Sequence, residues 1–309
     1  MYKINTCKGH YAAIYTVAGA FSEGKFFSAG GDRCIVEWDI HHPENGKLVA
    51  TTETQIYALA TLPGTPNRLV AGNMHGGLHW IDLAVPDLTK NIQHHQKGVF
   101  DLLVVGEWVF SAGGEGILTR WEAATARSVE SYQLTNRSLR ALAFSADRGE
   151  LAVGASDGCV YLLDVTTMAL RHTIRGAHTP SVFTVAYHPD GKTLLTGGRD
   201  ALVKIWNLPP LHPSTLHSSI LNAPPFLEIS AHWFTINHLV FSQNGHFFAT
   251  ASRDKTVKVW DAKTFELLKV ADTIRDGGHI NSVNRLLWLD ETLVSASDDR
   301  TIILWGFNK

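Results

Sequence analysis

Seven copies of one short pattern, spread along nearly the whole chain, restrict this fold more than any other feature of the sequence. In most copies apolar and polar residues alternate, as in Val257-Lys258-Val259, and each copy ends at a large apolar anchor. Such alternation is typical of a β-strand with one buried face. The anchors are Trp38, Ile81, Trp121, Leu163, Trp206, Trp260 and Trp305, so that successive anchors lie 43, 40, 42, 43, 54 and 45 residues apart. Repeats of about 40 to 45 residues hold four strands each, so the sequence predicts an all-β chain of seven repeated sheets.

A second element recurs in phase with the first. In five repeats a histidine stands four residues before the apolar residue that starts a predicted strand; these are His10, His95, His178, His232 and His279. With both elements present, the chain resembles the WD-repeat (WD40) family, whose repeats carry a Gly-His element and end in Trp-Asp. The resemblance covers essentially all of residues 1–309. It implies a seven-bladed β-propeller of four-stranded antiparallel blades, and the unbroken repeat indicates a single domain.

The two ends of the chain complete one another in this prediction. Residues 2–6 form a predicted strand ahead of the first Gly9-His10, whereas the last repeat stops at residues 307–309 without a fourth strand. We expect the amino-terminal strand to pair with the strand that ends at Trp305, so that both ends share the seventh blade. A closed ring leaves only short, protected outer edges.

One insertion interrupts the repeat and accounts for the step of 54 residues. Residues 209–225 contain five prolines and lie where the third strand of blade five should turn into the fourth. Proline disfavours both strand and helix, so we expect an exposed loop on the face opposite the histidine loops. The sequence leaves open whether this loop has a function or is a tolerated insertion.

Composition narrows the class of protein further. With 45% hydrophobic and 18% charged residues the chain can bury a large core. Its net charge of −2 provides no general basic field for a phosphate backbone. Cys7, Cys34 and Cys159 are odd in number and widely spaced, which indicates neither a disulfide framework nor a zinc cluster. No apolar run approaches the roughly 20 residues of a membrane span, so we expect a soluble, cytoplasmic protein.

The set His10, Ser28 and Asp32 invites comparison with a hydrolase triad, but its repetition argues against catalysis. An enzyme needs one nucleophile beside one oxyanion hole, not copies in several blades. The resemblance implies instead a structural tetrad in which the Trp indole, the hydroxyl, the imidazole and the carboxylate form a hydrogen-bonded chain. The predicted tetrads are His10, Ser28, Asp32, Trp38; His95, Ser111, Glu115, Trp121; His178, Thr196, Asp200, Trp206; His232, Thr250, Asp254, Trp260; and His279, Ser295, Asp299, Trp305.

The pattern weakens in the middle of the chain. Blade three has Glu115 where the others have Asp, and blades two and four lack the set altogether, with Thr52 and Thr135 at the histidine positions. We expect blades two and four to depend on apolar packing. Sixteen histidines raise the question of a metal, but most are explained by the loops or lie in pairs whose rings point apart, so we expect no metal, no catalytic residue and no cofactor.

The resemblance implies that partners bind around the central channel on the histidine-loop face. The residues one past each strand start are Tyr15, Tyr57, Phe100, Arg140, Phe183, Asn237 and Asn284. Arg199 and Arg253, just before the turn acids, join Arg140 in one sector, and Trp233-Phe234 follows a loop histidine. We expect Tyr15, Tyr57, Phe100, Arg140, Phe183, Arg199, Trp233 and Arg253 to bind partners. The alternative is that the aromatics face inward as packing.

The leading function is therefore a non-enzymatic scaffold that binds peptides or other proteins, acidic or phosphorylated segments among them. Two alternatives stay open. A nucleic-acid- or chromatin-associated subunit would use the arginine sector, and its affinity would fall steeply with salt. An enzyme using the channel would need a unique cluster of titratable groups, and the sequence offers none.

Overall fold

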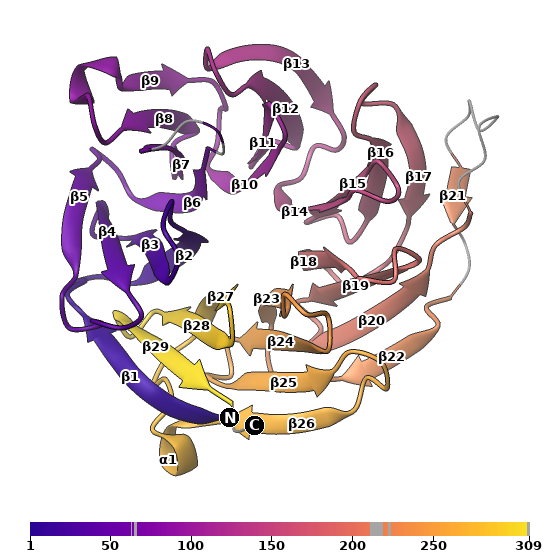
Figure 1. Ribbon diagram of the computed structural model, residues 1–309. Helices are drawn as coiled ribbons and strands as arrows, with labels where there is room; N and C mark the ends of the chain where they lie inside the picture. Colours follow the sequence, from indigo (N-terminus) through magenta and orange to yellow (C-terminus); the bar gives the residue numbers. More distant parts are fainter. Residues whose placement is uncertain (63, 65–66, 211–218, 222–223, 308–309) are drawn as a thin grey trace.

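The computed structural model describes residues 1–307 apart from 63, 65–66, 211–218 and 222–223. Seven β-sheets stand radially around one axis, each with its first strand innermost (Figure 1). The predicted all-β, seven-bladed propeller is confirmed. Among the described residues, two short helices lie outside the blades, the 3-10 helix η1 (Pro86–Leu88) and α1 (Thr273–Asp276).

The strands follow the chain blade by blade. Blade one holds β2 (Ile14–Gly19), β3 (Lys25–Gly30), β4 (Cys34–Asp39) and β5 (Lys47–Thr51), and blade two holds β6 (Ile56–Thr61), β7 (Arg68–Asn73), β8 (Gly77–Asp82) and β9 (Lys90–Gln93). Blade three holds β10 (Val99–Val105), β11 (Trp108–Gly113), β12 (Ile117–Glu122) and β13 (Arg127–Gln133). Blade four holds β14 (Leu139–Ser145), β15 (Glu150–Ala155), β16 (Val160–Asp164), β17 (Leu170–Ile174) and, as a fifth strand, β21 (Ser219–Leu221). Blade five holds β18 (Val182–Tyr187), β19 (Thr193–Gly198), β20 (Leu202–Asn207) and β22 (Leu227–Ser230). Blade six holds β23 (Ile236–Phe241), β24 (Phe247–Ser252), β25 (Val257–Asp261) and β26 (Leu267–Ala271), and blade seven holds β27 (Val283–Leu289), β28 (Thr292–Ser297), β29 (Thr301–Gly306) and β1 (Tyr2–Lys8).

Strand direction gives the ring two distinct faces. Because the first four strands of each blade are antiparallel, the loops leading into the first strands and the turns between second and third strands lie on one face. We call this the histidine-loop face. The turns between first and second strands, and between third and fourth strands, lie on the opposite face.

Strand β1 closes the ring, as predicted. It pairs antiparallel with β29, from Tyr2 opposite Gly306 to Lys8 opposite Thr301. Cys7 of β1 is only 1% exposed and belongs to an apolar cluster that also contains Ile302 of blade seven and Trp38 of blade one. The outer strand of the last blade therefore both completes its own sheet and packs near the first blade.

Apolar packing between blades supplies the core. Seven clusters of buried side chains occur, and each takes its residues from two adjacent blades, including the pair that joins blade seven to blade one. Every blade thus packs on a neighbour through both of its faces, whereas the alternating pattern predicted strands with one buried face. Polar residues of that pattern, such as Lys258, stay partly exposed.

A charge pair links first strands across the axis. Asp101 of blade three accepts a hydrogen bond from the Arg285 guanidinium of blade seven at 2.8 Å. Its other carboxylate oxygen accepts the Leu142 backbone N–H of blade four, also at 2.8 Å. Because Asp101 is buried, this pair ties three blades together where they converge.

The Pro-rich insertion differs from its prediction. Residues 219–221, which contain no proline, form β21 and pair in parallel with β17 of blade four instead of remaining in an exposed loop. Two side-chain contacts hold the inserted segment of blade five against blade four. Arg148 donates to the Pro209 carbonyl at 3.1 Å, and His172 Nδ1 lies 2.6 Å from Ser219 Oγ. The outer edge of β17 had backbone groups to satisfy, and this segment satisfies them. Residues 211–218 and 222–223 of the predicted loop lie outside the described residues.

Five blades contain the hydrogen-bonded chain that the resemblance implies. The Trp indole N–H donates to the Ser or Thr hydroxyl at 2.8 to 3.0 Å, and the hydroxyl lies 2.7 to 2.8 Å from His Nε2. His Nδ1 lies 2.5 to 2.9 Å from the carboxylate, and in blade three Glu115 provides that carboxylate. All five hydroxyl-bearing residues are fully buried.

The tetrad carboxylate also holds two segments of the histidine-loop face together. Asp254 accepts the backbone N–H of Trp233, which follows the loop histidine, at 3.1 Å. It also accepts the N–H of Thr256, beyond the turn, at 3.0 Å. The same pair of bonds recurs at Asp32, Asp200 and Asp299. Each of these four tetrads therefore fixes a histidine loop against the turn beside it.

Blades two and four correct the expectation that they depend on apolar packing alone. In blade two Asn73 Oδ1 accepts the N–H groups of His75 and Gly77 at 2.8 and 2.9 Å. In blade four Asp157 accepts the Tyr161 hydroxyl at 2.6 Å and the Cys159 N–H at 2.9 Å. A turn with unpaired backbone groups requires a side-chain acceptor whether or not a histidine is present, so other polar residues take that role.

Deleting residues 1–7 should destabilise the protein far more than trimming a loose end. The deletion exposes the edge of β29 and the apolar surface that Cys7 covers, which costs on the order of several kcal/mol at about 25 cal/mol per Å². Thermal denaturation measures the effect, with Ile4→Ser, an exposed change on the same strand, as the control. An unchanged melting temperature after the deletion would refute the closure.

Breaking a tetrad should lower the free energy of unfolding. We expect Asp254→Ala and His279→Ala each to cost about 2–3 kcal/mol, because each leaves buried partners of a charged group unpaired. Asp157→Ala should cost less, since Asp157 is exposed and serves fewer bonds. Urea denaturation compares the three, and equal losses would contradict a special role for the tetrads.

Stability should also fall in acid. Burial raises the pKa of the Asp254 and Asp299 carboxyls, but the hydrogen bonds from their histidines outweigh it, and the net pKa of each lies well below its usual value. Stability from such groups is present above the unfolded pKa of about 4 and is lost as the pH falls through the folded value. Burial lowers the pKa of His232 in the folded protein. As the pH falls below about 6.5, the unfolded chain therefore takes up a proton at this histidine before the folded chain does. Acid thus lowers the stability through His232 as well.

The melting temperature should therefore decline from neutral pH to about pH 3. In Asp254→Asn, which cannot titrate at this position, it should start lower and decline less steeply. A melting temperature that stays constant over this range in the native sequence would exclude the linkage.

Candidate functional site

Five residues, each the second residue of the first strand of its blade, form a continuous arc on the histidine-loop face. The rings of Tyr15 and Tyr57 meet edge to face at 5.4 Å, and Tyr57 stacks on Phe100 at 5.5 Å. The Arg140 guanidinium lies 4.1 Å from the centre of the Phe100 ring and 5.2 Å from that of Phe183. We call these five residues the central arc; they come from blades one to five, and all are half-buried.

Arg140 is the charged member of the central arc. Its guanidinium contacts two aromatic faces, a favourable cation–π arrangement, and its Nε donates to Ser156 Oγ at 2.9 Å. Burial lowers the pKa of the guanidinium, but an arginine stays cationic at neutral pH. The result is a fixed positive charge between two aromatic rings.

Blades six and seven continue the ring with amides instead of aromatics. Asn237 Nδ2 donates to Ser282 Oγ and the Val283 carbonyl, at 3.0 and 2.9 Å. Asn284 Nδ2 donates to the Ile14 carbonyl of blade one at 2.9 Å. The second residue of the first strand thus links neighbouring blades all around the propeller. In blades one to five it does so by contacts of aromatic and Arg side chains, and in blades six and seven by hydrogen bonds of Asn.

The remaining predicted residues lie farther out on this face. Arg199 and Arg253 are exposed on the turns of blades five and six, and the described residues offer their guanidinium groups no partner. Trp233 is 86% exposed and its neighbour Phe234 is 59% exposed. The structure thus brings five of the eight predicted residues into contact with one another and leaves Arg199, Trp233 and Arg253 separate.

Exposed charge is divided between the two faces. In the loops and turns of the histidine-loop face the exposed basic residues are Arg33, Lys97, Arg137, Arg175, Arg199, Arg253, Lys255 and Arg300, besides Arg275, which pairs with Asp272. Among the described residues, the exposed acids of those loops are Glu53 and Asp157. The described turns of the opposite face expose the acids Glu23, Glu44, Asp87, Glu107, Asp147, Asp190, Glu266, Asp290 and Glu291, against the basic residues Lys192 and Lys263. The small net charge therefore conceals a basic face and an acidic one.

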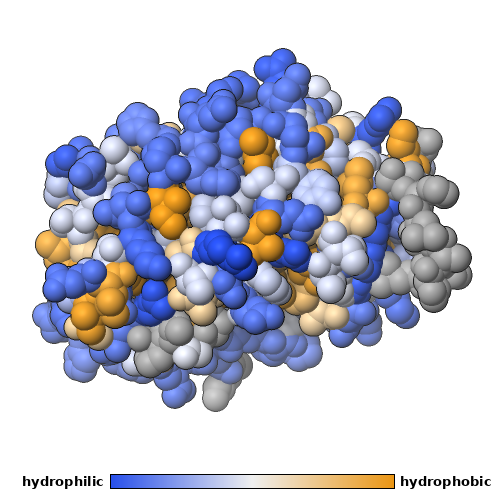
Figure 2. Space-filling view, turned by 90° about the horizontal axis from the view of Figure 1, so that it is seen from above, coloured by the Kyte–Doolittle hydropathy of each residue, from blue (hydrophilic) through white to orange (hydrophobic). Residues whose placement is uncertain are grey.

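Two exposed apolar residues escaped the sequence analysis. Tyr11 and Ile280 follow loop histidines, as Trp233 does, and are 63% and 67% exposed. A comparison of that single position across the repeats would have found them. By contrast, the outer rim on the side of β9 and β13 is mostly hydrophilic, with hydrophobic residues in small separate groups (Figure 2).

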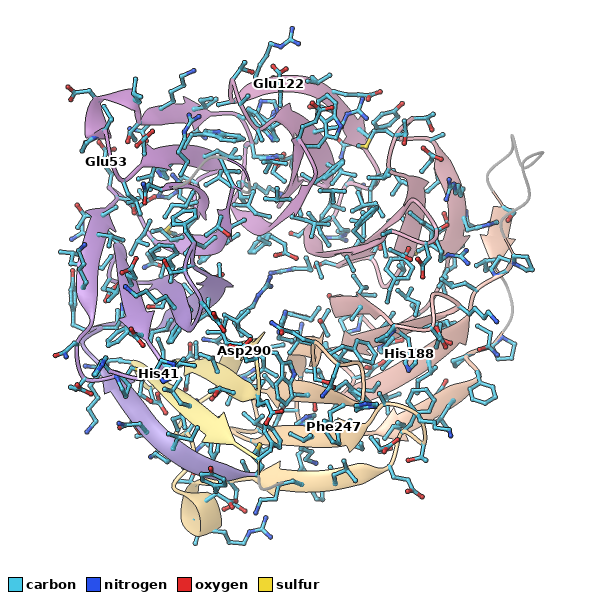
Figure 3. All side chains as sticks on the ribbon, viewed as in Figure 1. His41, Glu53, Glu122, His188, Phe247 and Asp290 are labelled. Atoms are coloured by element: carbon cyan, nitrogen blue, oxygen red, sulfur yellow. The ribbon has the colours of Figure 1, made fainter. Side chains whose placement is uncertain are left out.

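The described residues give less support to a metal site, to a small-molecule pocket beside the central arc or to a membrane-spanning helix. The described residues contain no group of three or more His, Cys, Asp or Glu side chains placed to hold a metal ion. A pocket of about 690 Å³ opens between blades five and six on the opposite face, where Figure 3 labels His188 and Phe247 of its lining. It contains no residue of the central arc. Neither helix of the described part is long and apolar enough to cross a bilayer.

Comparison with known proteins identifies the repeats. The family model "WD domain, G-beta repeat" matches residues 1–39, 169–207, 224–261 and 272–306. These segments end in blades one, five, six and seven, the four blades whose tetrads contain Asp. The unmatched part includes blade two and the first three strands of blade four, both without the tetrad, and blade three, which has Glu115.

Three relatives show how widely the similarity spreads. Protein HIRA of Dictyostelium discoideum is 31% identical over 142 residues, 42% of this chain and 12% of that protein. Nuclear distribution protein PAC1 of Arthroderma otae is 26% identical over 254 residues, 74% of this chain and 54% of that protein. Echinoderm microtubule-associated protein-like 2 of Rattus norvegicus is 26% identical over 277 residues, 86% of this chain and 40% of that protein. This chain therefore spans about half or less of the length of these relatives.

The repeated motifs, the ring of seven sheets and these matches agree with one another. The chain belongs to the WD40-repeat family of seven-bladed β-propellers.

Proposed function

We propose that this chain is a non-enzymatic scaffold that binds peptide or protein segments on its histidine-loop face. Propellers of this family are generally protein-interaction scaffolds and typically non-catalytic. The residues proposed to contact partners are Tyr15, Tyr57, Phe100, Arg140, Phe183, Arg199, Trp233 and Arg253.

The central arc is the observation that carries this proposal. Its aromatic rings and its fixed guanidinium touch in series across five blades. Aromatic and arginine side chains dominate the energetics of binding surfaces, and they lose little entropy on binding when already held by neighbours. The half-exposed rings suit apolar side chains, and Arg140 suits a carboxylate or a phosphate.

The tetrads give no support to catalysis. Their hydroxyls have no exposed surface, so none can reach a substrate. Each hydroxyl already accepts the indole N–H and lies within hydrogen-bond distance of the imidazole. Five such sets in five blades fit a repeated structural role, and the proposal therefore includes no catalytic residue, metal or cofactor.

A second candidate is a nucleic-acid- or chromatin-associated subunit, favoured by the exposed basic residues of the histidine-loop face. Binding of this kind releases counterions, so its affinity falls steeply as salt rises. Contacts through the central arc are largely apolar and cation–π, and they depend less on salt.

The proposal also places the protein in the cytoplasm, with which its three free cysteines are consistent.

The double variant Arg140→Glu with Arg253→Glu should abolish capture of acidic or phosphorylated partner segments. It reverses charge at one inner and one outer point of the proposed surface. Affinity purification with identification of the retained proteins provides the readout, and Lys192→Glu, an exposed change on the opposite face, is the control. Thermal denaturation should show that the double variant is folded.

Retention of every partner by the folded double variant would count against the proposal. Partners lost equally from the Lys192→Glu control would place binding elsewhere. A loss of affinity that follows the salt concentration as steeply as phosphate contacts require would favour the nucleic-acid alternative.

A further inference from the structure

Three adjacent blades expose a large apolar side chain at one equivalent position, directly after the loop histidine. These residues are Tyr11 of blade one, Trp233 of blade six and Ile280 of blade seven, and Phe234 extends the set. At this position the other blades carry polar residues, namely Glu53, Gln96, Asn136 and Thr179. The apolar exposure is thus confined to one continuous sector of the ring.

The backbone of these exposed residues is held in place. The N–H groups of Tyr11, Trp233 and Ile280 donate to tetrad carboxylates at 3.2, 3.1 and 3.0 Å. The Tyr11 hydroxyl also donates to the Asp32 carbonyl at 2.9 Å. Each apolar side chain therefore projects from a segment anchored to a buried hydrogen-bond chain, which lowers the entropy that binding would cost.

The same three blades place a basic residue directly after the tetrad Asp, in a strained conformation. Arg33, Lys255 and Arg300 have φ values of 67°, 75° and 69°, in the left-handed region that favours glycine. At the corresponding position blades two, three and four have the glycines Gly76, Gly116 and Gly158. Blade five has Ala201 there, with a φ of 66°, so the turn requires neither a glycine nor a basic side chain. Any role of the three basic residues therefore comes from their exposed charged groups. Strained residues of this kind gather at functional sites.

We infer that this sector is a docking site for a partner segment that carries both acidic and apolar side chains. We define the loop patch as Tyr11, Trp233, Phe234 and Ile280 with Arg33, Lys255 and Arg300. In each of these blades the tetrad Asp accepts the backbone N–H of the apolar residue and directly precedes the basic residue in the chain, so the segments that carry the apolar and the positive group are joined through one carboxylate. An acidic, apolar segment complements both properties. The inference rests on the proposed function, but the loop patch occupies blades six, seven and one, whereas the central arc occupies blades one to five.

The observations favour a protein segment over other polyanions. Single-stranded nucleic acid stacks successive bases on a series of aromatic rings. Tyr11, Trp233 and Phe234 are aromatic, but Ile280 of blade seven stands between blades six and one and interrupts such a series. An anionic bilayer attracts a dense cluster of basic residues. The loop patch with its neighbour Arg253 has exposed basic residues spread over three blades, each with an exposed apolar side chain. Nucleic acid and vesicles therefore serve as comparison probes.

Substituting glycine for the three basic residues tests the loop patch without threatening the fold. The variant R33G/K255G/R300G relieves the left-handed strain, so its melting temperature should be unchanged or higher. Short random peptides displayed on phage are selected against the native protein, and the binding of selected synthetic peptides is then measured by fluorescence anisotropy. The comparison variants are Trp233→Ser with Ile280→Ser, and Tyr57→Ala with Phe183→Ala in the central arc.

We expect selected peptides rich in Asp or Glu beside Leu, Ile, Phe or Trp. They should bind at least about tenfold more weakly to the triple glycine variant and to the Trp233/Ile280 variant. Their affinity for the central-arc variant should be unchanged.

Other outcomes overturn the inference in distinguishable ways. Peptides that bind the triple glycine variant normally but fail on the central-arc variant would leave the proposed function standing and remove the loop patch. Failure to select any peptide would remove both. Phosphatidylserine vesicles or single-stranded DNA that bind the native protein in place of peptides, and fail to bind the triple glycine variant, would assign the patch to a lipid surface or to nucleic acid.

Discussion

The rest of this structure depends on the pairing of β1 with β29. Each blade is a sheet with two apolar faces, and an open row of seven would leave two of those faces in water. Because residues 2–8 return to complete the last blade, blade seven packs on blade one as every other blade packs on its neighbour. The bridge from Asp101 to Arg285 adds a contact that crosses the axis and is possible only in a closed ring. Closure therefore sets the spacing and orientation of every loop on the histidine-loop face.

Within this ring, buried polar chains and exposed loops have separate tasks. A tetrad places an imidazole and a carboxylate between a strand and two loop segments, which satisfies backbone groups that apolar packing leaves unpaired. Asn73 and Asp157 satisfy the corresponding turns in blades two and four with other side chains. The residues beside these anchors are consequently free to differ from blade to blade, because the backbone that carries them is already fixed.

That freedom produces an asymmetric surface on a nearly symmetric frame. The second residue of the first strand is aromatic or Arg in blades one to five and Asn in blades six and seven. Conversely, the large exposed apolar residues after the loop histidine occur in blades one, six and seven. The two sets overlap only in blade one, so the histidine-loop face divides into two sectors of different chemistry. The acidic turns of the opposite face make it a poor surface for the same anionic partners.

The sequence by itself determined what is repeated and local. The number of blades and the closing strand can be predicted, because the hydrophobic period acts within one repeat and the two chain ends complete one. The partners within each tetrad followed from the resemblance to the WD40 family, and their hydrogen-bonding chemistry is consistent with it. The contacts between side chains and strands of different repeats were decided by the tertiary structure alone. Arg140 lies between Phe100 and Phe183, Asp101 reaches Arg285 across the axis, and residues 219–221 join the sheet of blade four, not the loop that their proline-rich surroundings suggest. These contacts depend on how the blades are rotated about the axis, and on which strand edges remain unpaired once the ring has closed, and no local pattern in the chain encodes either.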